Sequence, residues 1–284
     1  ALLPGMIVVS VGLIALVPRI ELNDQFVNYF DRSVEFRVDA DFAQDNLSGI
    51  NQAQWSLPAG ASGGVSEPDY LAAIDGFADW LRDRPEVVHV NTVTDIWKRL
   101  NKNMHGDQQS YYHLPEERDL AAQYLLLFEM SLPYGLDLNN QIDIDKSATR
   151  IIATMDNVTT SQLRALDAEA SQWLADNLPT GEATAATGPF VMFAYISERN
   201  IYAMLTGTVL AFVLISLTLG FALRDVKLGL ISLAPNLFPA FMAFGIWAIF
   251  VGEVGLASSV VAATSLGIIV DATVHFLSKY RRAR

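Results

Sequence analysis

Residues 255–278 read GLASSVVAATSLGIIVDATVHFLS, and a basic cluster over residues 279–284 follows them directly. This apolar run is long enough to cross a bilayer, which takes roughly 20 residues in a helix. It nevertheless contains one carboxylate, Asp271. An acidic side chain at mid-membrane costs about 2.5 to 3.5 kcal/mol on insertion scales. We therefore expect this carboxylate to face a protein partner or water.

Helical steps of three and four residues place five polar or small residues of this run on one face, which we call the polar stripe. Its members are Thr264, Gly267, Asp271, His275 and Ser278. A carboxylate one turn from an imidazole predicts a proton path, because ionisable residues inside a membrane commonly mark ion pathways. A structural alternative stays open. In it, Asp271 accepts a hydrogen bond that joins two helices, and His275 is a packing residue.

The charges divide the chain into an acidic part and a weakly basic part. The 284 residues include no Cys and have a formal net charge of −12. Residues 20–200 hold 28 Asp and Glu against 12 Lys and Arg, whereas the remainder holds 3 against 7. The absence of Cys excludes disulfides and thiolate metal sites. The acidic excess argues against a nucleic-acid partner, which would need a basic surface.

Three further apolar runs predict membrane helices, so that the sequence indicates four spans. They cover residues 1–19, 201–223 and 228–252. We interpret the first as a span whose beginning is missing, because it has neither the basic start nor the cleavage site of a signal peptide. The third contains PNLFP, and we expect Pro235 and Pro239 to kink its helix.

Residues 20–200 have no run long enough to span a membrane, and strand and helix patterns alternate along them. We expect strands over 51–57, 87–93 and within 141–155, and helices over 35–46, 70–82, 94–104, 115–131 and 159–178. This order predicts an α/β sandwich in which helices pack on one face of small sheets. The helix over 115–131 contains Leu125, Leu126 and Leu127, which cannot all face one core. Either the helix is buried all round, or part of it is open to a hydrophobic ligand.

Basic residues in short loops indicate the orientation in the membrane. Residues 224–227 and 279–284 are basic and fall on the same side if the spans alternate, which we take as the cytoplasmic side. The short loop at Glu253 then lies on the outer side, together with the large segment 20–200. Arg19 opposes this assignment only weakly.

The layout of one span, a large outer domain and then three closely spaced spans resembles half of a resistance-nodulation-division (RND) transporter. The residues that carry the resemblance are LISLAPNLFPAF (230–241) and SLGIIVDATVHFLSKYRR (265–282). The second has the family pattern of a Gly, three residues, an Asp and an exit rich in Arg and Tyr. The sequence is most similar to the MMPL, hydrophobe-exporter and Patched-like branch. Members of that branch often have Tyr or Asp directly after this Asp, whereas this chain has Ala272. His275 is therefore of greater interest as the neighbour of Asp271.

The resemblance implies a proton-driven exporter of lipids or other hydrophobic molecules in the cytoplasmic (inner) membrane, with a ferredoxin-like, porter-type domain over residues 20–200 on the periplasmic side. It implies that Asp271 relays protons, with His275 as its neighbour, and that the proton-motive force replaces any cofactor. The expected partners are a hydrophobic or lipid substrate, the membrane, a second half of the same chain that is missing here, and a possible homo-oligomer.

The sequence also bears on two other function classes. The span region also resembles the sterol-sensing domain, so a lipid-sensing or scaffolding module without transport is the alternative. An enzyme is not expected, because there is no HExxH, no Ser-centred elbow and no phosphate loop. The spacing of His89, His105 and His113 matches no common metal site. The alternating Asp and Ile over 143–146 lacks the Gly and the distal Glu of a calcium loop.

Overall fold

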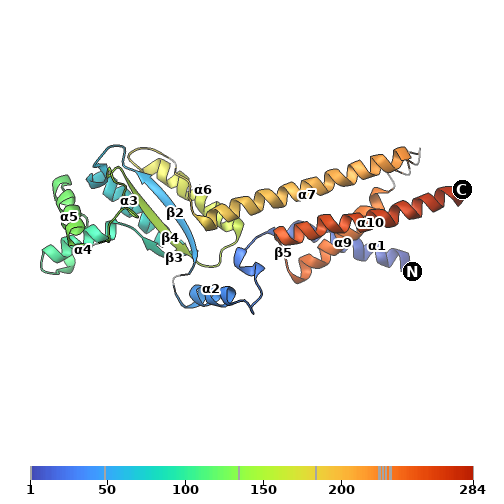
Figure 1. Cartoon of the computed structure of the whole chain (residues 1–284), viewed down its shortest axis with the longest axis horizontal. Helices are drawn as coiled ribbons and strands as arrows, with labels where there is room; N and C mark the ends of the chain where they lie inside the picture. The colour runs from blue at the N-terminus through green and yellow to red at the C-terminus, as the bar shows by residue number, and fades with distance from the viewer. Residues whose placement is uncertain are drawn as a thin grey trace. The chain divides into compact units, whose positions relative to one another are not determined.

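The computed structural model divides into two units (Figure 1). Unit 1 comprises Ala1–Gln25 and Ala194–Arg284, and unit 2 comprises Phe26–Phe193. The structure describes residues 2–47, 49–133, 135–182, 184–222, 225, 227, 229 and 232–283. Three residues of the basic segments 224–227 and 279–284, Arg224, Val226 and Arg284, lie outside the described residues. So do Ala1, Leu223, Leu228, Leu230 and Ile231 of the expected spans.

Unit 2 is built on an antiparallel sheet of three strands, β2 (Asn51–Pro58), β3 (Val87–Asn91) and β4 (Ala148–Met155). The strand order is β2-β4-β3, so β4 is central. Side chains of a strand alternate between its faces, and in β2 Ala53, Trp55 and Leu57 are fully buried while their neighbours are not. One face of the sheet therefore forms the base of the core.

Two helices supply the rest of this core, α3 (Pro68–Arg82) and α6 (Thr160–Asn177). The ring of Phe77 in α3 lies edge-on to Trp55 at 5.5 Å between centroids, and 5.4 Å from Trp173 in α6. A capping box between Thr159 and Gln162 begins α6, because each side chain bonds the other's backbone N–H. Aromatic contacts thus join both helices to one face of the sheet.

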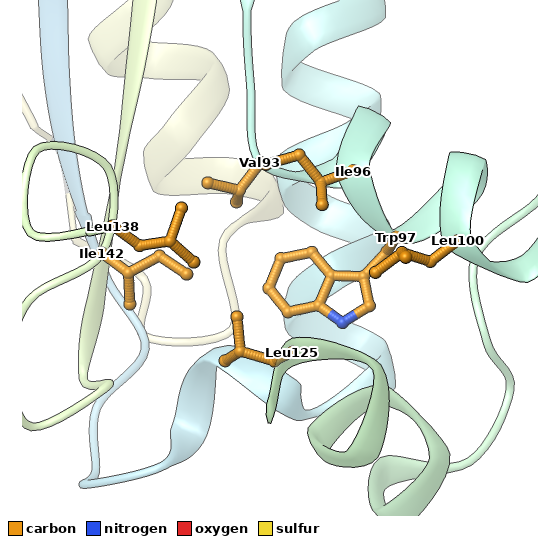
Figure 2. Close-up of a pocket in the computed structure, with 7 residues that line it drawn as sticks. All are labelled: Val93, Ile96, Trp97, Leu100, Leu125, Leu138 and Ile142. Carbon is orange, nitrogen blue, oxygen red and sulfur yellow. The ribbon is translucent and has the colours of Figure 1, made fainter. Parts of the chain in front are cut away.

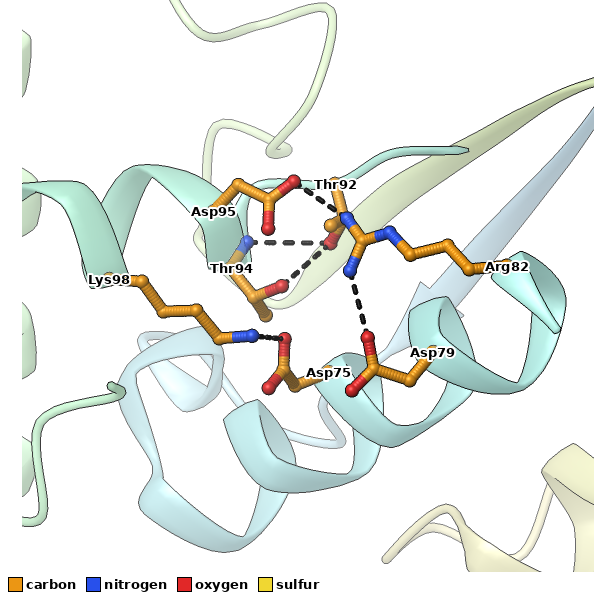
Figure 3. Close-up of polar contacts among 7 residues, drawn as sticks. All are labelled: Asp75, Asp79, Arg82, Thr92, Thr94, Asp95 and Lys98. Atoms are coloured by element: carbon orange, nitrogen blue, oxygen red, sulfur yellow. Dashed lines mark hydrogen bonds and ion pairs between the residues drawn. The ribbon is translucent and has the colours of Figure 1, made fainter. Parts of the chain in front are cut away.

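A helical layer extends from the sheet through α4 (Thr94–Met104) and α5 (Arg118–Ser131). The indole N–H of Trp97 donates to the carbonyl of Ala121 at 2.9 Å, which joins these two helices. Figure 3 shows the ion pairs that join α4 to α3: Lys98 with Asp75 at 2.6 Å, and Arg82 with Asp95 at 2.7 Å. Helix α2 (Glu35–Asn46) precedes the sheet. Short 3-10 turns complete the unit: η2 (Phe26–Tyr29), η3 (Gly64–Ser66) and η4 (Gln109–Tyr111).

The helices and strands expected for unit 2 from the sequence are confirmed, but the ferredoxin-like, porter-type sheet is wrong. That fold needs a fourth strand, and beside β2 the described residues form only one isolated bridge, between Gln54 and Thr187. The reason is local. Gly188 takes φ 120°, and Pro189 begins helix α7 immediately afterwards, so no strand can continue past Thr187.

Unit 1 contains α1 (Leu2–Ile14), η1 (Val17–Arg19), most of α7 (Pro189–Ala222), α9 (Leu233–Phe250) and α10 (Leu256–Ala283). Helix α9 packs against both α1 and α10. Two short strands, β1 (Glu21–Leu22) and β5 (Glu253–Val254), pair in parallel at the junction of α9 and α10. The chain segment after α1 is therefore attached to the loop between α9 and α10.

The expectation of four membrane spans is wrong. Among the described residues, two helices are long and apolar enough to cross a membrane, Pro189–Ala222 and Leu256–Tyr280. The runs expected as the first and third spans form shorter apolar helices, Pro4–Arg19 and Asn236–Phe250. Pro18 cannot donate the backbone hydrogen bond that an α-helix needs there, and the chain tightens into the 3-10 turn η1. Helix α9 ends where Gly252 takes φ 77°.

Gly245 brings α9 against the backbone of α1, and this contact leads to a first prediction. A Cβ at position 245 would lie less than 3 Å from the carbonyl carbon and Cβ of Leu13. We expect Gly245→Ala to lower the thermal stability of the detergent-solubilised protein, because overpacking against backbone costs roughly 1 to 3 kcal/mol.

Gly267→Ala is the matched control, since a Cβ there meets no heavy atom within 4 Å and Ala favours a helix. An unfolding temperature for Gly245→Ala equal to or above that of Gly267→Ala would contradict the close packing of α1 on α9.

Asp143 organises the turn before β4 and leads to a second prediction. Its carboxylate accepts hydrogen bonds from the Ser147 hydroxyl (2.6 Å) and from the N–H groups of Ser147 (2.6 Å) and Ala148 (2.8 Å). The bond from the Ser147 hydroxyl, followed by those from the two N–H groups, holds the pKa of Asp143 below its usual value. A carboxyl group whose pKa is lower in the folded than in the unfolded state stabilises the fold at pH values above its unfolded-state pKa. This stabilisation is lost as the pH falls through the folded-state pKa.

We therefore expect Asp143→Ala to lower the unfolding temperature at about pH 6, with a difference from wild type that shrinks towards about pH 3. Asp145→Ala is the control. In the described residues, the hydrogen bonds of Asp145 use its backbone carbonyl. A difference for Asp143→Ala that stays constant over this range would contradict the prediction.

Candidate functional site

The ionisable residues of the polar stripe lie together on α10. The Nε2 atom of His275 is 3.6 Å from Oδ1 of Asp271, one helical turn away. Both side chains are about three-quarters exposed in this chain. An exposed pair of this kind contributes little in water. In hydrocarbon, by contrast, a carboxylate needs a nearby polar partner, and the imidazole of His275 is within reach of it.

No hydrogen bond or ion pair joins the other stripe residues to this pair among the described residues. Thr264 is exposed, and its hydroxyl donates to the carbonyl of Val261 within α10. Gly267 is exposed, and Ser278 is half-buried. The structure thus brings together Asp271 and His275, whereas Thr264, Gly267 and Ser278 lie along the helix without a shared site.

The opposite side of α10 carries a polar contact that the sequence reasoning missed. The hydroxyl of Thr273 donates to Oδ1 of Asn236 in α9 at 2.6 Å, and both residues are buried. The signal for it was present, since Asn236 is the polar residue of PNLFP in an otherwise apolar run. The two prolines differ in position. Pro235 lies in the first turn of α9, where its missing N–H costs nothing, whereas Pro239 lies inside the helix.

An apolar cavity of about 380 Å³ lies between α7, α9 and α10. Its lining includes Phe212, Pro239, Phe244, Trp247, Val261 and Ile269. Its size falls in the range of small-molecule pockets, which are mostly apolar with a few polar groups. The cavity suits an apolar ligand better than a charged one.

The junction of β1 and β5 fixes the start of α10. The side-chain amide of Asn23 donates to the carboxylate of Glu253 at 2.9 Å, and the indole of Trp247 donates to the Glu253 carbonyl at 2.7 Å. Asp24 Oδ1 accepts from the N–H of Leu256, the first residue of α10, at 3.4 Å. A carboxylate at a helix N-terminus is stabilising, so a residue more than 200 positions away in the sequence caps α10.

Unit 2 offers a smaller apolar pocket and an exposed apolar helix face. Figure 2 shows Trp97 and Leu100 of α4, Leu125 of α5, and Leu138 and Ile142 converging on the pocket. Its free volume of about 10 Å³ is close to the space of one water molecule, so it holds no substrate as it stands. On the other side of α5, Leu126 is 54% and Leu127 41% exposed, so this helix is not buried all round.

Two of the three histidines of unit 2, His105 and His113, make local hydrogen bonds. Nδ1 of His105 donates to the carbonyl of Asn101, and Nδ1 of His113 donates to that of Leu114, each at 2.8 Å. The ring of Tyr111 stacks on His105 at 3.9 Å between centroids. Within the described part of the chain, no group of three or more His, Asp or Glu side chains is placed to hold a metal ion.

The comparisons with known proteins identify no family for this chain. No protein-family model matches the chain, and no curated protein matches it.

Proposed function

We propose that the chain is part of a proton-coupled transporter of the RND type, which exports lipids or other hydrophobic molecules across the cytoplasmic membrane. The observation that carries the proposal is the pairing of Asp271 with His275 on α10, a helix of spanning length. The resemblance of residues 230–241 and 265–282 to the MMPL, hydrophobe-exporter and Patched-like branch supports the same function.

The proposed mechanism is a change in the charge of this pair. A proton from the outer side neutralises Asp271, which removes the cost of keeping an ionised carboxylate within the membrane. The two protonation states then favour different packings of α10, and transport follows the shift between them. The proton-motive force supplies the energy, so the proposal includes neither a cofactor nor an enzymatic step.

The proposed orientation places residues 20–200 on the periplasmic side of a multi-pass protein. The β1–β5 pairing supports it, because Glu21 and Glu253 lie side by side in unit 1. The basic residues after Ser278 are at the far end of α10, whose 28 residues extend about 42 Å at 1.5 Å per residue. That length separates an outer end from a cytoplasmic end.

The proposed partners are a hydrophobic or lipid substrate, the membrane, a second half of the transporter and a homo-oligomer. The exposed Leu126, Leu127 and Met130 of α5 support a hydrophobic substrate, since this helix presents apolar side chains outside the core of unit 2.

A lipid-sensing or scaffolding module without transport is the second candidate. The apolar cavity between α7, α9 and α10 favours it, because such a pocket accommodates part of a lipid without any proton movement. In this case Asp271 and His275 have a structural role. Proton flux across a vesicle membrane separates the two functions.

We expect Asp271→Asn in the full-length protein to abolish proton-coupled transport while leaving the fold intact, because the amide keeps the size of the carboxyl group and cannot carry the proton. The measurement is substrate-dependent proton movement in liposomes with a trapped pH-sensitive dye. Asp225→Asn is the control, since Asp225 is also acidic and lies after α7, outside the stripe. Wild-type proton movement by Asp271→Asn would remove this carboxylate from the mechanism.

A further inference from the structure

The hydrogen bond between Thr273 and Asn236 is the strongest polar contact between α9 and α10 that the structure describes. The hydroxyl lies 2.6 Å from Oδ1 of the amide, and the two residues are 7% and 0% exposed. Replacing either partner with an apolar residue leaves the other buried without it, which is costly away from water. This contact therefore helps to set how α10 is turned relative to α9.

The Thr273 hydroxyl has a second acceptor. Its oxygen lies 3.2 Å from the carbonyl of Ile269, one turn earlier in α10. A hydroxyl carries one hydrogen and donates to one acceptor at full strength. If α10 turns away from α9, the same hydrogen can pass to Ile269, so Thr273 stays satisfied in both arrangements. Thr273 can therefore give up its hydrogen bond to Asn236 at little cost.

The α9 side of the contact is under-bonded. The Nδ2 atom of Asn236 is buried and has no hydrogen-bond partner among the described residues. Three residues later, Pro239 has no N–H to donate to the carbonyl of residue 235, which weakens α9 at this level. A buried donor without a partner is unusual in a native structure and needs an explanation. A second arrangement of α9 and α10 that competes with this one provides such an explanation.

Asp271 and Thr273 lie on opposite faces of α10, because two residues correspond to about 200° of helix rotation. A turn of α10 that moves Asp271 to a new environment therefore also strains the bond from Thr273 to Asn236. Few other charges act on this region. Helices α1 and α9 contain no ionisable side chain, and α7 contains none after Tyr202. Lys279, Tyr280 and Arg282 follow on α10 itself.

We propose that Thr273 and Asn236 are positioning residues of the proton-coupled step. Their hydrogen bond holds α10 in one of two arrangements, and the protonation state of the Asp271–His275 pair selects between them. This inference rests on the proposed function and adds the contact through which protonation of α10 changes its packing on α9.

The test compares Thr273→Val, which removes the hydroxyl at similar size, with Thr273→Ser, which keeps it. Thr218→Val is the matched control, since the hydroxyl of Thr218 in α7 lies outside the polar stripe, is exposed, and donates to the carbonyl of Leu214 in its own helix. The 284 residues include no cysteine, and any cysteine elsewhere in the full-length protein is first replaced, so that spin labels attach through Phe241→Cys on α9 and Phe276→Cys on α10. The full-length protein is reconstituted in lipid vesicles, and the label distances and transport are measured from about pH 5 to 8.

We expect two distance populations whose ratio changes with pH in wild type, Thr273→Ser and Thr218→Val. In Thr273→Val this ratio should change roughly fivefold at a given pH, the effect of one typical hydrogen bond. The pH midpoint of transport should move with it by about 0.7 unit, the logarithm of that factor. If Thr273→Val is not recovered folded, Thr273→Ala takes its place.

If Thr273→Val matches Thr218→Val in both distance ratio and pH profile, the inference is overturned, even if Asp271→Asn has abolished transport. A single distance population at every pH overturns it as well. Wild-type proton movement by Asp271→Asn is a different result, because it removes the proposed function itself, whatever Thr273→Val does to the label distances.

Discussion

An ionisable carboxylate within an apolar helix of spanning length is the constraint on which the organisation of unit 1 depends. Asp271 is expensive wherever water is absent, and the helix meets this cost with an imidazole 3.6 Å away and with both side chains turned out of the contact with α9. The face that packs on α9 carries Thr273, whose hydroxyl donates a hydrogen bond to Asn236. The helix thus separates a titratable face from a neutral, hydrogen-bonded one.

The end of unit 1 at the β1–β5 junction is better bonded than the level of Asn236. At the β1–β5 junction, Asn23 and Asp24 bond Glu253 and the first turn of α10. Gly245 lets α9 approach the backbone of α1. At the level of Asn236, by contrast, α9 has a buried donor without a partner in the described residues and a proline four residues after Pro235. The β1–β5 end of unit 1 is therefore better bonded than the start of α9.

Unit 2 follows a different principle, since its stability comes from one buried face. Trp55, Phe77 and Trp173 join the sheet to α3 and α6 through aromatic packing. The layer of α4 and α5 is attached by the Trp97 indole and by ion pairs. Because α5 has only one side against this layer, Leu126 and Leu127 remain exposed, and these apolar side chains are available for a hydrophobic ligand.

Periodicity, capping residues and prolines determined the local structure, because these are properties of neighbouring residues. They predicted the strand at 51–57, the helix at 94–104 and the helix over 159–178. Apolar length alone failed to separate spanning helices from shorter ones, since Pro18 and the φ of Gly252 limit α1 and α9. The pairing of Asp271 with His275 followed from helical spacing. Only the tertiary structure decided that Thr273 meets Asn236 and that Asp24 caps α10, because these contacts join residues 37 and 232 positions apart, and no local pattern specifies which helices pack together.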